Sequence, residues 1–156
     1  MQKFDDEPLM EFKNINRAYD SIRLNHDENL LKKWRNGSTG IPIIDACMRC
    51  LDKTGYLNFR MRAMIVSFAA FNLWQDWKYF SHHLAKKFLD YEPGIHYSQI
   101  QMQSAVTGIN TVRIYNPVKN STDLDPKGDF IKKWVSELES IPCLLYTSPS
   151  PRDQLQ

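Results

Sequence analysis

Two arginines and two acids are spaced so that they could act together. Arg60 and Arg62 stand at the start of a long apolar segment, and Asp90 and Glu92 follow a second, shorter one. A guanidinium and a carboxylate can hold each other in place while their remaining donors and acceptors address a flat, hydrogen-bonding ligand. The same residues would also make an ordinary salt bridge that anchors a helix. On the residues alone, that salt bridge is the default interpretation.

The segments that carry these residues have the apolar period of helices. Residues 27–34 begin with the N-cap candidate Asp27 and end in lysines, which suits the helix dipole. Pro42 can open the next helix and Gly55 can end it. A wide apolar face predicts a long inner helix over residues 58–77. Further helices are expected over residues 80–88, 97–106 and 128–138, and a short one over 14–23. Residues 90–94 should form a loop, and residues 116–127 should be irregular. No repeat or strand pattern is present, so the sequence predicts an all-α helical bundle.

Composition places the chain among packed globular domains. It has 156 residues, of which 42% are hydrophobic and 12% aromatic. A net charge of +2 does not by itself predict nucleic-acid binding. The longest apolar run, residues 63–73, is interrupted and too short to cross a bilayer, and no secretory leader is visible. We therefore expect no membrane contact and a cytoplasmic location.

Cysteine and histidine usage argues against a metal or redox site. Cys47 and Cys50 form a C-x-x-C in the middle of an expected helix, without a second pair. The histidines His82, His83 and His96 have no ligand-like spacing. Redox C-x-x-C motifs usually begin a helix. We expect two buried thiols and no metal.

The sequence changes character near its end. Residues 143–156 contain two prolines at alternate positions, and the string resembles translated adapter sequence. We expect a non-native or disordered tail there, and a partial helical domain over residues 1–142. A native disordered terminus is the alternative.

Several short motifs follow one another in order from Trp34 to Leu138. They are Thr39-Gly40-Ile41-Pro42, Thr54-Gly55, Asp76-Trp77, Ile114-Tyr115-Asn116-Pro117 and Asp125-Pro126-Lys127-Gly128. Their order and spacing resemble the C-terminal FAD-binding helical domain of the photolyase/cryptochrome family. In that family the flavin lies in a U shape inside the helical domain and passes an excited electron to a pyrimidine lesion.

The resemblance implies a flavin site. By position, Asp90 and Glu92, with Tyr91 between them, match the acids that reach the flavin, and Arg62 matches the arginine that pairs with the first acid. Positive charge there would stabilise the reduced, anionic flavin. His96 falls near the side chain that faces the flavin's reactive nitrogen, although an ordinary loop histidine fits equally well.

The resemblance also implies contacts with DNA and a path for electrons. Arg60 matches a position that meets DNA, where it would contact a phosphate. The asparagine usual before it is Phe59 here, and Asn58 lies one place earlier. Trp77 matches the middle member of an electron-transfer chain, whereas the member nearest the flavin is absent. Trp74, expected one helical turn before Trp77, could substitute for it or could be plain core.

The implied function is that of a fragment of a DNA photolyase, a carbon–carbon lyase that uses reduced FAD and light to repair cyclobutane pyrimidine dimers. Damaged DNA would be the partner, the protein a monomer, and an N-terminal antenna domain would belong to the parent protein. This chain would carry one side of the pocket and be inactive alone. The alternatives are a cryptochrome-type blue-light photoreceptor and a helical interaction domain without flavin.

Overall fold

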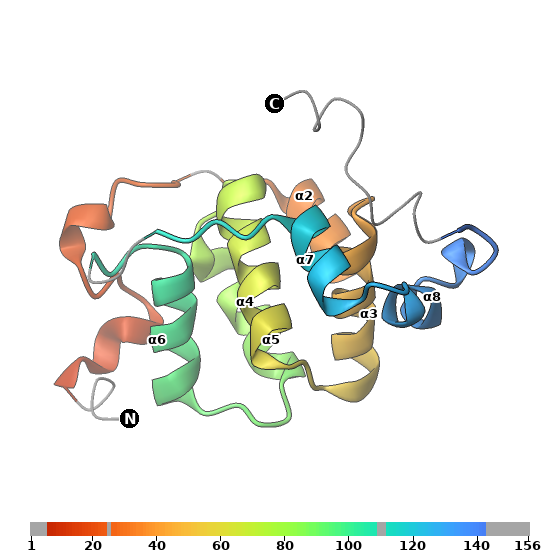
Figure 1. The fold of residues 1–156 in the computed structure, drawn as a ribbon. Coiled ribbons are helices and arrows are strands. Elements are labelled where there is room, and N and C mark those ends of the chain that lie inside the picture. Colours follow the sequence, from red (N-terminus) through yellow and green to blue (C-terminus); the bar gives the residue numbers. More distant parts are fainter. Residues whose placement is uncertain (1–5, 25, 109–111, 143–156) are drawn as a thin grey trace.

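Helices alone build the regular structure in the described part of the chain. The computed structural model describes residues 6–24, 26–108 and 112–142, and within these ranges no strand occurs. The prediction of an all-α domain is therefore confirmed (Figure 1). The expected tail, residues 143–156, lies outside the described residues. The elements are η1 (Pro8–Glu11), η2 (Arg17–Tyr19), α2 (Glu28–Arg35), α3 (Pro42–Thr54), α4 (Phe59–Ser67), η3 (Phe68–Asn72), η4 (Trp77–Tyr79), α5 (Ser81–Lys87), α6 (Pro93–Gln103), α7 (Pro117–Leu124), α8 (Asp129–Trp134) and η5 (Ser136–Leu138).

Sequence signals mark the start of α2 and both ends of α3 as predicted. The Asp27 side chain accepts hydrogen bonds from the backbone N–H groups of Asn29 and Leu30 at the start of α2. Pro42 stands in the first turn of α3, where no N–H is needed. Gly55 ends α3 with φ 70°, a left-handed conformation that glycine adopts without steric cost.

The long helix predicted over residues 58–77 ends early. It runs as α4 and then widens into the π-helical turn η3, which closes at Asn72. Trp74 has φ 53°, outside the helical region, and Trp77 belongs to the separate turn η4, which Asp76 caps. The Gln75 side chain holds the break, because its amide donates to Leu73 O and accepts from Asp27 N. Apolar periodicity continues across this break, and for that reason the sequence suggested one helix.

Four other segments differ from expectation. Residues 117–124 form α7, because Asn116 accepts from the N–H groups of Val118 and Lys119 and Pro117 occupies the first turn rather than breaking the helix. Glu92 caps α6, which therefore begins at Pro93 rather than at residue 97. The helix expected over 128–138 divides at Val135 into α8 and η5, and the one over 14–23 is only the turn η2.

The core lies around α3 and α4; α6 packs on α4 at one side, and α8 packs on α3 at the other (Figure 1). The largest side chains with almost no exposure are Trp34, Trp77, Tyr97 and Phe80. The N-terminal segment packs on α6 through Gln101, a fully buried residue. Its amide donates to Met10 O at 2.7 Å and to Lys13 O at 3.0 Å, and its oxygen accepts from Ile15 N at 2.8 Å. This one side chain of α6 thus makes three hydrogen bonds to the N-terminal segment.

Candidate functional site

Arg62 and Asp90 are in direct contact. Nη2 of Arg62, on α4, donates to Oδ2 of Asp90 at 2.8 Å, and Nε donates to Leu57 O at 2.6 Å. The guanidinium lies 4.2 Å from the ring centre of Phe88 and 5.3 Å from that of Tyr56. It holds the pKa of Asp90 below its usual value, chiefly through the hydrogen bond. The Asp90 side chain is 55% exposed, so this pair forms an open wall rather than an enclosed cavity.

The position of Asp90 depends on the end of α3. Gly55 O accepts from Leu89 N at 3.0 Å, which fixes the residue immediately before Asp90. A Cβ on Gly55 would lie 2.5 Å from Cγ of Leu89, so the two segments approach as closely as glycine allows. The left-handed stop that the sequence suggested for α3 therefore also positions the acid.

Glu92 and Tyr91 follow Asp90 with different environments. The Glu92 carboxylate accepts from Ile95 N at 2.8 Å, and this cap fixes it at the start of α6. The Tyr91 ring is partly exposed and packs edge-on against His96, with 5.3 Å between ring centres. The exposed side chains on these segments are mostly apolar or aromatic: Tyr56, Leu89, Tyr91 and Ile95. A charged pair among uncovered apolar groups suits a ligand that is flat, partly apolar and rich in hydrogen-bonding groups.

His96 is a buried residue of a helix rather than a loop histidine. Its Nε2 lies 2.9 Å from Ser81 O. Because a carbonyl only accepts, Nε2 carries the proton, and Nδ1 is the ring atom that Ser81 leaves available. Burial lowers the pKa of His96, so the imidazole is neutral at neutral pH. The prediction that it faces a flavin stays a prediction.

The two tryptophans have opposite environments. Trp77 is 1% exposed, and its indole N–H donates to Oδ1 of Asn14 at 2.7 Å. Trp74 is 47% exposed, and the Arg23 guanidinium lies 5.0 Å from its ring centre and 4.4 Å from that of Phe71. The expectation that both lie on one helix face is wrong, because the helix ends between α4 and η4.

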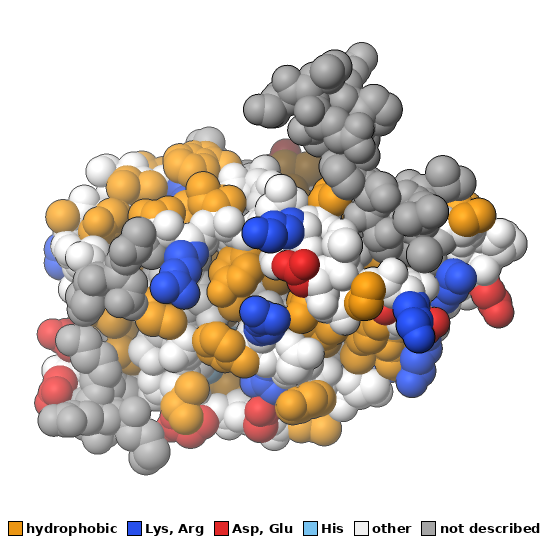
Figure 2. Space-filling model, viewed as in Figure 1, with side chains coloured by type: hydrophobic (Ala, Val, Ile, Leu, Met, Phe, Trp, Pro, Cys, Tyr) orange, Lys and Arg blue, Asp and Glu red, His pale blue; other side chains and the backbone are white. Residues whose placement is uncertain are grey.

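Asn58, Phe59 and Arg60 stand at the start of α4. The Asn58 side chain caps this helix by accepting from Met61 N at 3.0 Å. Phe59 and Arg60 are exposed and line a hollow of about 730 Å³ beside α7. Arg113 and Lys119 line the same hollow. Figure 2 shows basic side chains around an acidic one on this face.

Arg113 and Lys119 were not identified from the sequence. Arg113 directly precedes the Ile114-Tyr115-Asn116-Pro117 motif, and Lys119 follows it closely. Their nearness to that motif was the available signal. That nearness to the motif became informative only because α7 lies beside the start of α4 in the structure.

Comparisons with known proteins agree on one family. The family model for the FAD binding domain of DNA photolyase matches residues 1–156. A photolyase from Sulfolobus tokodaii superposes with a TM-score of 0.87 at 34% identity, over 95% of this chain and 36% of that one. The chain belongs to the FAD-binding domain family of DNA photolyases.

Relatives within this photolyase family carry two kinds of name. A cryptochrome DASH from Ostreococcus tauri is 36% identical over 81% of this chain and 23% of its own length. A deoxyribodipyrimidine photo-lyase from Alkalihalophilus pseudofirmus is 32% identical over 87% of this chain and 29% of its own length. A class III photolyase from Agrobacterium tumefaciens superposes with a TM-score of 0.87 at 29% identity, over 97% of this chain and 32% of that one. This photolyase-family chain thus spans about a third or less of most of these proteins.

The residues of the Arg62–Asp90 wall fit the family's cofactor. FAD has a flat heteroaromatic ring with hydrogen-bonding edges, and the wall offers a fixed guanidinium, a carboxylate and uncovered aromatic side chains. Arg62, Asp90 and Tyr91 are the residues that would hold it. Because the Asp90 side chain is 55% exposed, the wall is accessible to a ligand on this side.

The remaining motifs describe structure rather than chemistry. Cys47 and Cys50 are buried thiols on α3, and burial raises the pKa of Cys47, which makes it unreactive. Among the residues that the structure describes, no group of three His, Cys, Asp or Glu side chains could hold a metal ion. Nor does the described part of the chain contain a helix long and apolar enough to cross a membrane.

Proposed function

We propose that this chain forms one wall of the flavin site in a light-driven DNA-repair enzyme, which splits cyclobutane pyrimidine dimers with an electron from reduced FAD. The observation that carries the proposal is the Arg62–Asp90 contact of 2.8 Å, made among exposed aromatic groups. The photolyase names of several relatives support the reaction class.

The electrostatics of the wall suit a reduced flavin. When bound and photoexcited, FAD supplies the electron. The protein holds Arg62 by Asp90, by Leu57 O and by the Phe88 ring. A cation fixed in this way stabilises negative charge on a neighbouring ring without reorganising, because its donors are already oriented.

The hollow beside α7 suits a nucleic-acid backbone. Arg60, Arg113 and Lys119 line it, with Asp123 as its acidic residue. Basic side chains on a groove contact phosphates without reading sequence. Phe59, which is exposed at the same hollow, offers a ring on which a base can stack. Where the family usually has an asparagine that makes a polar contact with the lesion, Phe59 would make an apolar one.

Of the two tryptophans, Trp77 is the better electron carrier. Oxidation creates positive charge on an indole, and the Arg23 guanidinium beside Trp74 opposes that charge. Trp77 has Lys78 Nζ at 5.9 Å from its ring centre, but that ammonium is bound to Asp76, which offsets its field. Trp77 therefore keeps the role proposed for it, and Trp74 is the weaker candidate.

The test uses the intact protein of which these residues form part. After purification, an absorbance band at about 450 nm reports oxidised flavin. Blue light should then restore thymines in an oligonucleotide with one cyclobutane dimer, as measured by chromatography, and a dark control should not. A protein purified without flavin would contradict the proposal and favour a helical interaction domain.

A cryptochrome-type photoreceptor is the second candidate, because a cryptochrome DASH is among the relatives. It predicts a bound flavin with light-driven changes in its spectrum and no loss of dimers. Flavin without repair, under conditions in which a known photolyase repairs the same oligonucleotide, would select this role.

A further inference from the structure

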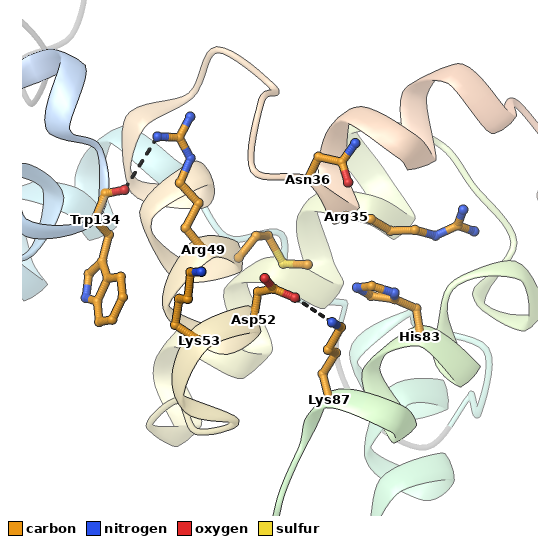
Figure 3. Close-up of a pocket in the computed structure, with 9 residues that line it drawn as sticks. Arg35, Asn36, Arg49, Asp52, Lys53, His83, Lys87 and Trp134 are labelled. Atoms are coloured by element: carbon orange, nitrogen blue, oxygen red, sulfur yellow. Dashed lines mark hydrogen bonds and ion pairs between the residues drawn. The ribbon is translucent and has the colours of Figure 1, made fainter.

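A second hollow, which is lined by neither Arg62 nor Asp90, lies among α2, α3, α5 and α8 (Figure 3). Its volume is about 370 Å³, within the size range of small-ligand sites. It shares no lining residue with the hollow beside α7.

Positive charge predominates in this lining. The lining contains four cationic side chains, Arg35, Arg49, Lys53 and Lys87, and one acidic side chain, Asp52. Lys87 is paired with Asp52, whereas the acids that pair with Arg35 and Arg49 are not part of the lining. Within the described part of the chain, Lys53 makes no ion pair. Three of the four cations thus have an acidic partner, Glu28 for Arg35, Glu137 for Arg49 and Asp52 for Lys87, and Lys53 is the cation that remains to meet an anion.

One of these cations is fixed in place. Nε of Arg49 donates to Gly37 O at 3.0 Å, and Nη1 lies 2.8 Å from Oε2 of Glu137 and 3.5 Å from Trp134 O. Because the guanidinium is already immobilised, it would lose little conformational entropy on meeting an anion. Lys53 and the Trp134 ring stand on the same side of the hollow in Figure 3.

His83 on α5 responds to this charge. Burial, together with Arg35 on α2 and with Lys86 and Lys87 on its own helix, lowers the pKa of His83 to about 4, and Asp52 opposes this only in part. At neutral pH the imidazole is therefore neutral, with one donor and one acceptor nitrogen. An anion held beside it would favour the protonated form.

We propose that this hollow binds a small phosphate-bearing anion, of the size of a phosphate monoester or a diphosphate. Four cationic side chains on three elements, α2, α3 and α5, line a space that admits such a group, and the Asn36 amide lies among them. Guanidinium and ammonium groups are the side chains that most often bind phosphate. The site does not depend on the proposed flavin function, because it uses none of the same residues.

The test measures binding of inorganic pyrophosphate to the chain by calorimetry and by the NMR signals of the His83 ring. We expect saturable binding that weakens as salt rises, and a higher His83 pKa in the presence of pyrophosphate. Lys53→Gln removes an exposed, unpaired charge and should weaken binding by about fivefold. Asp52→Asn removes the one carboxylate and should strengthen binding by about threefold.

The matched control is Lys32→Gln, which removes an exposed lysine of α2 outside the hollow and should leave the affinity unchanged. Circular dichroism confirms that each variant is folded. Equal affinities of Lys53→Gln and Lys32→Gln, or an unchanged His83 pKa at saturation, would overturn the proposal. So would a His83 response to short undamaged duplex DNA but none to pyrophosphate, because the phosphate source would then be a nucleic acid.

Discussion

Nη2 of Arg62 and Oδ2 of Asp90 lie 2.8 Å apart, and this contact joins α4 to the loop that leads into α6. Each member of the pair is also held by a second contact. The Arg62 guanidinium packs on the Phe88 ring, and the backbone N–H of Leu89, next to Asp90, donates a hydrogen bond to Gly55 O. The first acid of the proposed flavin wall is therefore positioned by three separate segments of chain.

Asp90→Ala in the intact protein should lower flavin occupancy, because Arg62 would lose the partner that orients it. The expected decrease in affinity is about tenfold, the usual effect of removing one partner of a charge-assisted hydrogen bond. The ratio of flavin to protein absorbance measures it. Glu139→Ala, an exposed acid near the end of the described chain, is the control and should have no effect. Unchanged flavin occupancy in Asp90→Ala would show that the Arg62–Asp90 pair is an ordinary structural salt bridge.

Gly55→Ala should destabilise the protein more than Gly40→Ala does. Both glycines have positive φ, 70° and 87°, so alanine costs about 1 kcal/mol at either position. Only at Gly55 would the new Cβ meet Leu89, and we expect about 1–2 kcal/mol more there. Urea unfolding measures both values. Equal losses would mean that Leu89 moves aside freely.

Trp77→Phe should lower the free energy of unfolding by about 2–3 kcal/mol, because it removes buried volume and the hydrogen bond to Asn14. Trp74→Phe, at a half-exposed position, should cost less than about 1 kcal/mol. Chemical denaturation followed by circular dichroism compares the two. A larger loss for Trp74→Phe would contradict the assignment of Trp77 to the core.

The pKa of His83 makes stability depend on pH in a defined window. Below its ordinary pKa of 6.5 the unfolded chain binds a proton there, while the folded chain does so only near pH 4. This contribution is fully present above pH 6.5 and is lost as the pH falls toward 4. Between pH 7 and pH 5 it amounts to about 1 kcal/mol, discounted for partial exposure.

His83→Gln should therefore flatten the dependence of unfolding free energy on pH over this range. Urea titrations of both proteins at pH 7 and pH 5 give the comparison. A variant with the same pH slope as the parent chain would show that His83 is not the titrating group. Some slope will remain in either case, since burial also lowers the pKa of His96.

Arg60→Gln and Arg113→Gln should weaken DNA binding by the intact protein regardless of base sequence. If each arginine contacts a phosphate, each substitution reduces the slope of log affinity against log salt by about 1. Fluorescence anisotropy at several salt concentrations measures this slope. Lys78→Gln, on η4 and outside the hollow, is the control. An unchanged slope would exclude these arginines from the DNA interface.

Local signals in the sequence predicted the elements that local contacts decide. Asp27 and Gly55 mark the beginning of α2 and the end of α3 because a cap needs only its nearest neighbours in the chain. Asn116 carried the same information for α7, but two prolines nearby suggested irregular chain instead. The meeting of Arg62 with Asp90 came from the resemblance, since spacing alone allowed an ordinary salt bridge.

Contacts between distant segments could not be predicted. The break after Asn72 depends on Gln75 and Arg23, whose partners lie far from them in the sequence. Arg113 joins Arg60 at one hollow only because α7 packs on α3 beside the start of α4. Such arrangements arise from tertiary packing, which periodicity and capping patterns do not predict.

The anchoring of the N-terminal segment has a practical consequence for anyone who trims this protein. The recognisable motifs begin at Trp34. Inside the bundle, however, the Gln101 amide donates hydrogen bonds to the carbonyls of Met10 and Lys13, and the Trp77 indole donates to the Asn14 side chain. Deleting the first two dozen residues would remove the hydrogen-bond partners of the Trp77 indole and the Gln101 carboxamide, and would uncover the core surface that Met10 covers. A shortened version should therefore begin ahead of Met10, whatever boundary sequence similarity suggests.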